Sequence, residues 1–218
     1  LGGAANVANN IKKLSGQVFF LSLIGKDKEG LKIKRLLKHS KIKHKLLEDN
    51  SYKTSHKNRG HLDKKLIFRV DSEEPKKIKL LHKKIILKFI KKNIKNFSSI
   101  IISDYNKGFF DKDLIKKISL IFKNENKLII TNPKNRNISY YNYSNIIVPN
   151  EKEFNNFFTK KISLKKKIND FFNKIVGLKH LIITRGYKSV LIASFEKKAS
   201  KKVVTKKYTS FVKKHEIE

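Results

Sequence analysis

Residues 1–11 read Leu-Gly-Gly-Ala-Ala-Asn-Val-Ala-Asn-Asn-Ile, and no other stretch of the chain says as much about its fold. Gly2 and Gly3 stand just before an expected amphipathic helix, and without Cβ atoms they let the backbone approach a ligand closely. The first N–H groups of a helix have no partner inside it and can bind hydroxyls or anions. Asn6, one turn further on, adds a donor and an acceptor. The stretch predicts a ligand site at a helix start; a tightly packed turn is the alternative.

Short apolar runs alternate with longer helical patterns along the rest of the chain. The apolar runs have the length and composition of buried strands, and they cover residues 17–24, 99–103, 127–131, 145–148 and 180–184. Helical patterns cover residues 6–14, 28–39, 76–93, 112–124 and 166–176. Pro75 is placed for the first turn of the third helix. This alternation predicts an α/β fold with a mostly parallel central sheet and helices on both faces.

Residues 52–71 interrupt the alternation. Two extended stretches, 52–58 and 64–70, have no helix between them, and a turn containing Gly60 joins them. We expect a hairpin that projects from the sheet as a small β lid; an ordinary edge hairpin is the alternative. The 218 residues suffice for a single α/β domain.

The formal net charge of +34 comes from 52 basic and 18 acidic residues, but only five of the basic residues are arginine. Nucleic-acid-binding proteins use arginine for bidentate contacts to guanine and phosphate, and lysine cannot reproduce this geometry. The lysines are spread over nearly every expected helix and loop. The composition therefore argues against nucleic acid as the main partner, and the positive field would attract ATP and sugar phosphates.

Other protein classes are excluded by missing signals. The chain has no cysteine, so disulfides and thiolate metal sites are excluded, and its seven histidines lack zinc-binding spacing and are expected at the surface. It contains neither a G-x-S-x-G nor a P-loop motif. No apolar run has membrane-spanning length and no signal peptide is visible, so we expect a cytoplasmic protein. Because methionine is absent and the chain begins with Leu1, we expect a piece of a longer reading frame.

Polar clusters follow four of the expected strands, at the strand ends where open parallel sheets bind ligands. They begin at Ser103, Asn132, Pro149 and Thr184. Together with the paired glycines, these clusters resemble the ribokinase-like (PfkB) family of carbohydrate kinases over nearly the whole chain. Further matches are residues 23–27 (L-x-G-x-D) and 150–153 (N-x-x-E). Residues 69–71 (RVD) and 103–105 (SDY) most resemble the D-glycero-β-D-manno-heptose 7-phosphate kinase domain of bifunctional ADP-heptose synthesis enzymes.

The resemblance implies that ATP, with Mg²⁺, phosphorylates the anomeric hydroxyl of the heptose phosphate, a step in ADP-heptose and lipopolysaccharide core synthesis. The residues implied to hold the sugar phosphate are Gly2, Gly3 and Asn6 at its hydroxyls, with Arg69, Asp71, Asp104 and Lys107. Those implied on the nucleotide side are Lys134, Asn150, Glu151, Lys152, Glu153 and Thr184. Glu153 would also organise Mg²⁺ through its waters. A homodimer through the lid and a fused nucleotidyltransferase domain stay open.

Structural alternatives stand beside three of these roles. Arg69 and Asp71 could form only a cross-strand ion pair on an exposed hairpin, which would stabilise the protein little. Asp104 could be a turn or helix-cap residue. Glu153 could be a carboxylate early in a helix, where the helix dipole stabilises its negative charge.

The sequence also departs from the family. A Gly-Ala-Gly-Asp element, which in the family supplies an anion hole and the catalytic base, does not occur in the 218 residues, and neither does the strand that precedes the paired glycines. Asn132 replaces an acidic residue and Ser189 replaces a glycine. We therefore expect one partial kinase domain over residues 1–218, truncated at both ends and inactive alone. Another sugar or nucleoside kinase, a decayed kinase and a basic nucleic-acid-binding protein remain alternatives.

Overall fold

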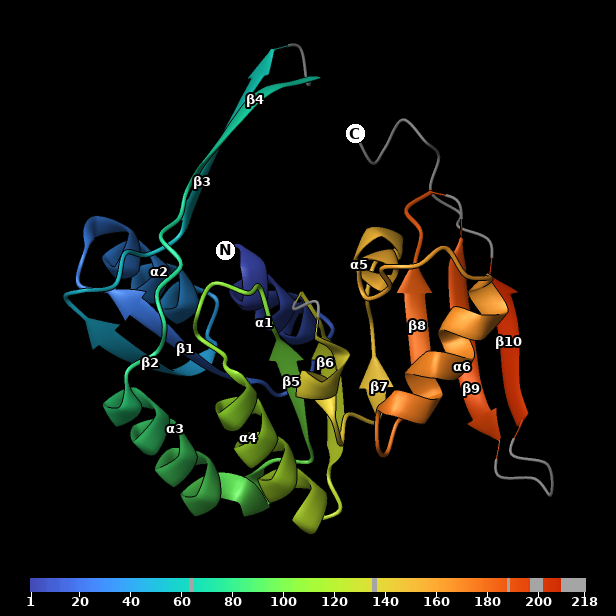
Figure 1. Ribbon diagram of the computed structural model, residues 1–218. Coiled ribbons are helices and arrows are strands. Elements are labelled where there is room, and N and C mark those ends of the chain that lie inside the picture. The colour runs from blue at the N-terminus through green and yellow to red at the C-terminus, as the bar shows by residue number, and fades with distance from the viewer. Residues whose placement is uncertain (63–64, 135–136, 188, 197–201, 209–218) are drawn as a thin grey trace. The chain divides into compact units, whose positions relative to one another are not determined.

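A computed structural model of the chain describes residues 1–62, 65–134, 137–187, 189–196 and 202–208. The chain divides into two compact units. The first comprises Leu1–Ile78 and Asn106–Phe109, and the second comprises Lys79–Tyr105 and Phe110–Glu218. Both contain parallel strands with helices between them, which confirms the predicted α/β class (Figure 1).

A β-α-β crossover forms the body of the first unit. Its elements are α1 (Gly3–Lys13), β1 (Phe19–Gly25), α2 (Lys28–His39) and β2 (Lys43–Asp49), with β1 and β2 parallel. Ala5 and Ala8 of α1 lie in an apolar core with Phe20, Leu37 and Ile42. The small alanine side chains allow α1 to pack closely, so the helix start is held on a packed body.

The turn between β1 and α2 is tied to the chain that leads into the hairpin. Asp27 caps α2, because its Oδ1 accepts a hydrogen bond from the Gly30 N–H at 2.7 Å. Its Oδ2 accepts from the Thr54 N–H at 2.8 Å, and Thr54 Oγ1 accepts from the Gly25 N–H at 2.8 Å. A Cβ at Gly25 would lie 2.3 Å from the Tyr52 carbonyl oxygen. The glycine and the aspartate of the L-x-G-x-D pattern, Gly25 and Asp27, therefore start α2 and hold residues 52–54 against this turn.

Strands β3 (His56–Leu62) and β4 (Lys65–Ser72) form the predicted antiparallel hairpin, which projects from the body (Figure 1). The sequence placed Gly60 in the turn, and this was wrong. Gly60 lies inside β3 at a register shift, where a Cβ would lie 2.2 Å from the Phe68 ring. Residues 63 and 64, including the start of the second expected stretch, lie outside the described residues.

The second unit contains a mixed sheet with strand order β10-β9-β8-β7-β6-β5. Strands β5 to β8 are parallel, whereas β9 and β10 are antiparallel to their neighbours. The bounds are β5 (Ser99–Ser103), β6 (Leu128–Asn132), β7 (Ile146–Ile147), β8 (His180–Thr184), β9 (Val190–Glu196) and β10 (Lys202–Tyr208). Among the described residues, β5 pairs only with β6 and forms one edge of the sheet.

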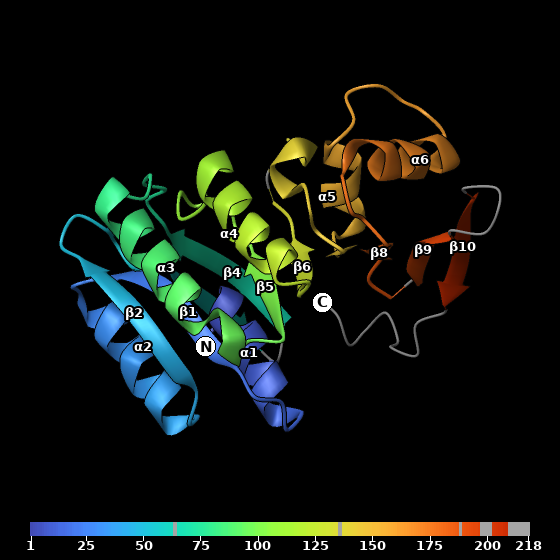
Figure 2. The same ribbon diagram turned by 90° about the horizontal axis from the view of Figure 1, so that it is seen from below.

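Helices of the second unit pack by their apolar faces. They are α3 (Leu80–Asn93), η1 (Ile94–Asn96), α4 (Lys112–Asn124), η2 (Ile138–Tyr141), α5 (Glu151–Asn156) and α6 (Leu164–Lys174). α3 and α4 lie side by side (Figure 2). Phe172 of α6 stacks on Phe195 of β9, with ring centroids 6.1 Å apart. In the described parts of the chain, no helix is both long and apolar enough to cross a membrane.

Two details of the α3 region were predicted wrongly. The helix begins at Leu80 and not around Pro75, because the preceding segment is bound elsewhere: Lys76 and Ile78 donate their N–H groups to the carbonyls of Lys107 and Gly108. His82, expected at the surface, is buried with 8% exposure. It shares the buried face of α3 with Ile86 and Ile90, four and eight residues further on.

Candidate active site

The start of α1 brings the three residues expected at sugar hydroxyls together. Gly3 has a φ of +54°, in the left-handed region that favours glycine. Gly2 is exposed and its missing Cβ would meet nothing within 4 Å. Because Ala5 and Ala8 are the buried residues of α1, the exposed Asn6 lies away from the core. The geometry leaves this end open, and its role in sugar binding stays a prediction.

An ion-pair cluster at the base of the hairpin contains Arg69, Asp71 and Lys107. Two hydrogen bonds, of 2.7 and 2.6 Å, join the Arg69 guanidinium to the Asp71 carboxylate along β4. These bonds, with a further one from Lys57, hold the pKa of Asp71 well below its usual value. Glu73 accepts from Lys57 at 2.9 Å and also pairs with Lys107. The ion-pair alternative is correct only in part: Arg69 and Asp71 bind each other, but along β4 and not across the strands, because they lie two residues apart on one strand. The cross-strand partner of Asp71 is Lys57.

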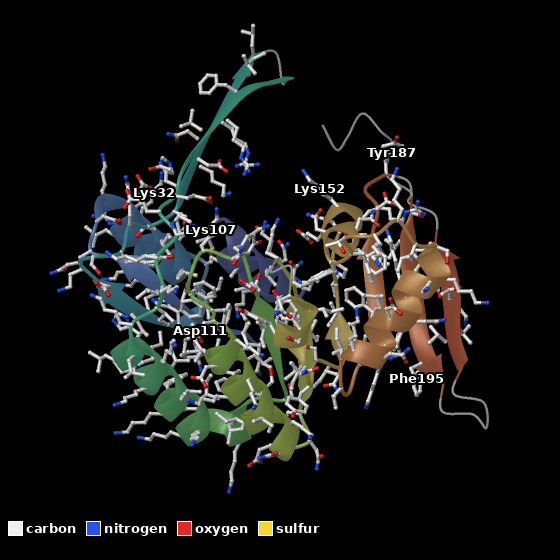
Figure 3. All side chains as sticks on the ribbon, in the orientation of Figure 1. Lys32, Lys107, Asp111, Lys152, Tyr187 and Phe195 are labelled. Carbon is white, nitrogen blue, oxygen red and sulfur yellow. The ribbon has the colours of Figure 1, made fainter. Side chains whose placement is uncertain are left out.

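Lys107 is held in the first unit by the main chain around it. The Lys76 N–H donates to the Lys107 carbonyl at 3.3 Å, and the Ile78 N–H donates to the Gly108 carbonyl at 2.9 Å. Gly108 has a φ of +85°, and a Cβ there would lie 2.1 Å from the Lys76 carbonyl oxygen. Only glycine permits this close approach, so the loop that carries Lys107 is docked on the segment leaving the hairpin (Figure 3).

Asp104 lies directly beyond the carboxyl end of β5, in the second unit, and is 3% exposed. Its N–H donates to the Asn132 carbonyl at 3.0 Å. The Tyr141 hydroxyl donates to Asp104 Oδ2 at 2.7 Å, and Tyr141 is completely buried. Tyr141 was not among the residues predicted for the site. Its only signal was a tyrosine pair, residues 140–141, in a polar segment, and a buried tyrosine needs a partner for its hydroxyl.

The residues expected on the nucleotide side meet where β7 and β8 end. Asn150 caps α5 and forms a reciprocal capping box with Glu153, with hydrogen bonds of 2.8 and 2.9 Å. An isolated parallel bridge pairs Asn150 with Thr184, the last residue of β8. Lys134 Nζ lies 2.8 Å from Glu153 Oε1. Four of the six predicted residues are thus brought together.

Glu151 and Lys152 are directed elsewhere. Glu151 accepts a 2.9 Å hydrogen bond from Arg185 Nε, and the exposed Lys152 side chain points away from α5 (Figure 3). Ser189 is fully buried, and its main-chain carbonyl accepts from the Arg185 N–H at 3.0 Å. These contacts join Arg185 to Glu151 and to Ser189.

The metal-binding capacity of this region rests on Glu153. Both of its carboxylate oxygens already accept hydrogen bonds or an ion pair from protein groups. Within the described residues, no group of three His, Cys, Asp or Glu side chains could hold a metal ion. Mg²⁺ keeps several waters and binds substrate phosphates, so a single carboxylate that contacts its waters fits this ion.

Comparison with known proteins identifies relatives of the chain. The family profile described as pfkB family carbohydrate kinase matches residues 1–212. The bifunctional protein HldE of Helicobacter pylori (strain HPAG1) is 36% identical over 154 residues, which are 70% of this chain and 33% of that protein. HldE of Aliarcobacter butzleri is 37% identical over 154 residues, 70% of this chain and 32% of that protein. The chain spans about a third of the length of these curated relatives.

Solved structures share the fold at low sequence identity. The tetrameric inhibited form of phosphofructokinase-2 from Escherichia coli aligns with a TM-score of 0.72 and 13% identity, covering 94% of this chain and 66% of that chain. A carbohydrate kinase from Agrobacterium tumefaciens aligns with a TM-score of 0.65 and 16% identity, covering 88% and 61% of the two chains.

Proposed function

The chain belongs to the pfkB family of carbohydrate kinases, and on that premise we propose that it forms the sugar- and nucleotide-binding part of a kinase for D-glycero-β-D-manno-heptose 7-phosphate. The reaction belongs to ADP-heptose and lipopolysaccharide core synthesis, and its use of ATP suits the cytoplasm. In this reaction the anomeric oxygen bonds to the γ-phosphorus of ATP. The bond from that phosphorus to the oxygen retained by ADP breaks, and the hydroxyl proton goes to a base.

The observation that carries the proposal is the meeting of Lys134, Asn150, Glu153 and Thr184 at adjacent strand ends. This edge is where open parallel sheets bind phosphate-bearing ligands. Lys134 would pair with a phosphate, and Thr184 would donate to one. Glu153 would order the waters of Mg²⁺, which when bound neutralises charge on the transferred group.

The heptose assignment rests on the sugar side. Asn6 and the two glycines would hold hydroxyls, and Arg69, Asp71, Asp104 and Lys107 would face the anionic end of the sugar. The HldE relatives support a bifunctional parent, so we propose that a nucleotidyltransferase domain belongs to the same protein.

The hairpin supports a homodimer. Leu62, Ile67, Phe68 and Val70 are each more than half exposed on this two-stranded ribbon. Exposed apolar strands favour association with a second copy. Light scattering should show a dimer that Val70→Lys converts to a monomer, and a monomer before the substitution would contradict it.

Binding calorimetry against a panel of sugars tests the proposed substrate. The chain should bind heptose 7-phosphate more tightly than ribose, fructose 6-phosphate or a nucleoside, and it should bind Mg·ATP separately. Preference for another sugar would reassign the substrate within the family. Salt-sensitive binding to DNA without binding of any sugar would favour the nucleic-acid alternative instead.

A further inference from the structure

Tyr141 and Asp104 form a buried hydrogen bond, and Tyr141 has no role in the proposed reaction described above. Asp104 directly follows β5, at the strand end where the sheet binds ligands. The Tyr141 hydroxyl, 2.7 Å from Asp104 Oδ2, is the donor, and the carboxylate oxygen is the acceptor. A carboxylate that is 3% exposed is costly unless hydrogen bonds replace its water. The tyrosine therefore does more than fill space.

The position of Tyr141 is fixed by bonds on both sides of it. On the N-terminal side of Tyr141, the Asn137 side chain accepts a hydrogen bond from the Ser139 N–H at 3.1 Å and so caps η2. On the C-terminal side, the Ser144 N–H donates to the Tyr141 carbonyl at 3.2 Å, and the Ser144 hydroxyl is 2.8 Å from Thr131 Oγ1 in β6. η2 also packs against α4 and α6.

A side chain held in this way can orient its partner. A charge-assisted hydrogen bond is short and directional, so a strong donor on Oδ2 restricts rotation of the carboxylate about its last bond. Groups that bind a ligand are effective when neighbouring hydrogen bonds lock their geometry beforehand.

We propose that Tyr141 is a positioning residue for sugar binding, acting through Asp104; the inference rests on the proposed function, in which Asp104 faces the sugar phosphate. Tyr141 itself contacts no substrate. Its hydroxyl sets the direction in which the Asp104 carboxylate meets the sugar, so its loss reduces sugar affinity and leaves nucleotide affinity intact.

A double-mutant cycle on the 218-residue chain tests this proposal. Calorimetry with heptose 7-phosphate and with Mg·ATP is run on the unaltered chain, Tyr141→Phe, Asp104→Asn and the double variant. Tyr141→Phe should weaken sugar binding about tenfold, the loss typical of a hydrogen bond to a charged group. It should leave ATP binding unchanged and have no effect in the Asp104→Asn background. Tyr140→Phe, in the same turn, is the matched control and should bind sugar as the unaltered chain does.

The outcomes distinguish failure of the positioning role of Tyr141 from failure of the proposed function. Unchanged sugar affinity in Tyr141→Phe with a lower urea midpoint would show a purely structural bond, and an equal loss in the Asp104→Asn background would show that Tyr141 does not act through Asp104. Either result overturns the inference alone. Failure of the unaltered chain to bind any sugar phosphate overturns the proposed function and the inference with it. If Tyr141→Phe does not fold, 3-fluorotyrosine at position 141 changes the acidity of the hydroxyl without removing it. No change in sugar affinity would then overturn the proposal.

Discussion

Lys134 Nζ lies 2.8 Å from Glu153 Oε1, while Glu153 Oε2 accepts a 2.9 Å hydrogen bond from the Asn150 N–H. Lys134 follows β6 and Glu153 stands in the first turn of α5, after β7, so two neighbouring strand ends share one charge pair. The Glu153 side chain is 12% exposed and Lys134 is 40% exposed. The lysine is therefore the more exposed partner, and we propose that it turns to a phosphate while the carboxylate stays in place.

Substituting Glu153 by Gln should reduce Mg·ATP affinity at least tenfold, as loss of a group that orients metal-bound water typically does. Glutamine at this helix position can still complete the capping box, so the urea midpoint should change little. Calorimetry with Mg·ATP and with the sugar measures the two affinities, and urea unfolding measures the midpoint. Glu151→Gln, which breaks only the pair with Arg185, is the control. Equal loss of sugar and nucleotide binding would remove Glu153 from the metal role.

Asn6→Ala should weaken sugar binding by about 1–3 kcal/mol, the usual effect of leaving a polar partner unsatisfied. ATP binding should not change. The thermal midpoint should also stay constant, because Gly2 and not Asn6 caps the helix and Asn6 is exposed. Calorimetry and a melting curve decide the matter. A lower midpoint with both affinities intact would mean that Asn6 serves the helix only.

The 218-residue chain should bind its substrates without turning them over. Its sequence contains no Gly-Ala-Gly-Asp element, and an anion hole and a general base each accelerate such reactions by orders of magnitude. Release of ADP in the presence of Mg·ATP and heptose 7-phosphate is the assay. Robust turnover would mean that other residues supply these groups.

Asp27 should make the first unit sensitive to acid. Burial raises the pKa of its carboxyl, but hydrogen bonds from Thr54 and Gly30 outweigh this effect, and the pKa lies below its usual value. A carboxyl with a lowered pKa stabilises the fold above its unfolded-state pKa, about 3.9, and this stabilisation is lost as the pH falls through the folded-state value.

Asp27→Asn should accordingly lower stability by about 1–3 kcal/mol at neutral pH, because an amide offers one acceptor oxygen where two N–H groups need one each. The difference from the unaltered chain should shrink as the pH falls toward 2. Urea unfolding at several pH values measures it. Asp113→Asn, in an exposed pair with Lys117, is the control. A constant difference across this pH range would contradict the account.

Gly108→Ala should undock the loop that carries Lys107. A side chain at φ +85° costs about 1–3 kcal/mol by itself. The clash with the Lys76 carbonyl adds to that cost. Gly186→Ala is a matched control, since Gly186 also has a positive φ, +58°, but open space around it. Urea unfolding should show a larger loss for Gly108→Ala, and equal losses would mean that the loop is not docked.

The sequence predicts best where the pattern is strong and local. The strands at 99–103 and 180–184 and the helices at 28–39 and 112–124 have the predicted bounds, because apolar periodicity and the caps Asp27 and Asp111 mark them. Strands β2, β9 and β10 were not predicted. In β2 and β10 the apolar pairs Leu46-Leu47 and Val203-Val204 stand among charged and polar residues, too few to form a periodic pattern. The apolar run of β9 was overlooked. The start of α3 was misplaced because a distant loop binds the preceding N–H groups.

The site was predictable to the extent that strand ends concentrate polar residues. Asn150, Glu153, Thr184 and Lys134 meet as the motifs suggested. The sequence indicated the Arg69–Asp71 pair only as an alternative, and it gave no sign that Tyr141 binds Asp104, because these pairings depend on side-chain directions and on long-range packing. The division into two units also depends on tertiary contacts, and the expected single domain stays a prediction.

Within the second unit, and among the described residues, β5 forms one edge of the sheet, and this bears on how the protein behaves in concentrated solution. Its sequence, Ser-Ile-Ile-Ile-Ser, has neither charge nor proline to discourage another chain from adding to that edge, and Ile101 is 39% exposed. Mutual repulsion between molecules of charge +34 opposes such contacts. Added salt screens this repulsion over about 10 Å at 0.1 M. Samples should thus stay dispersed in dilute buffer and turn cloudy as ionic strength rises, the reverse of the behaviour of proteins that precipitate when their charges attract.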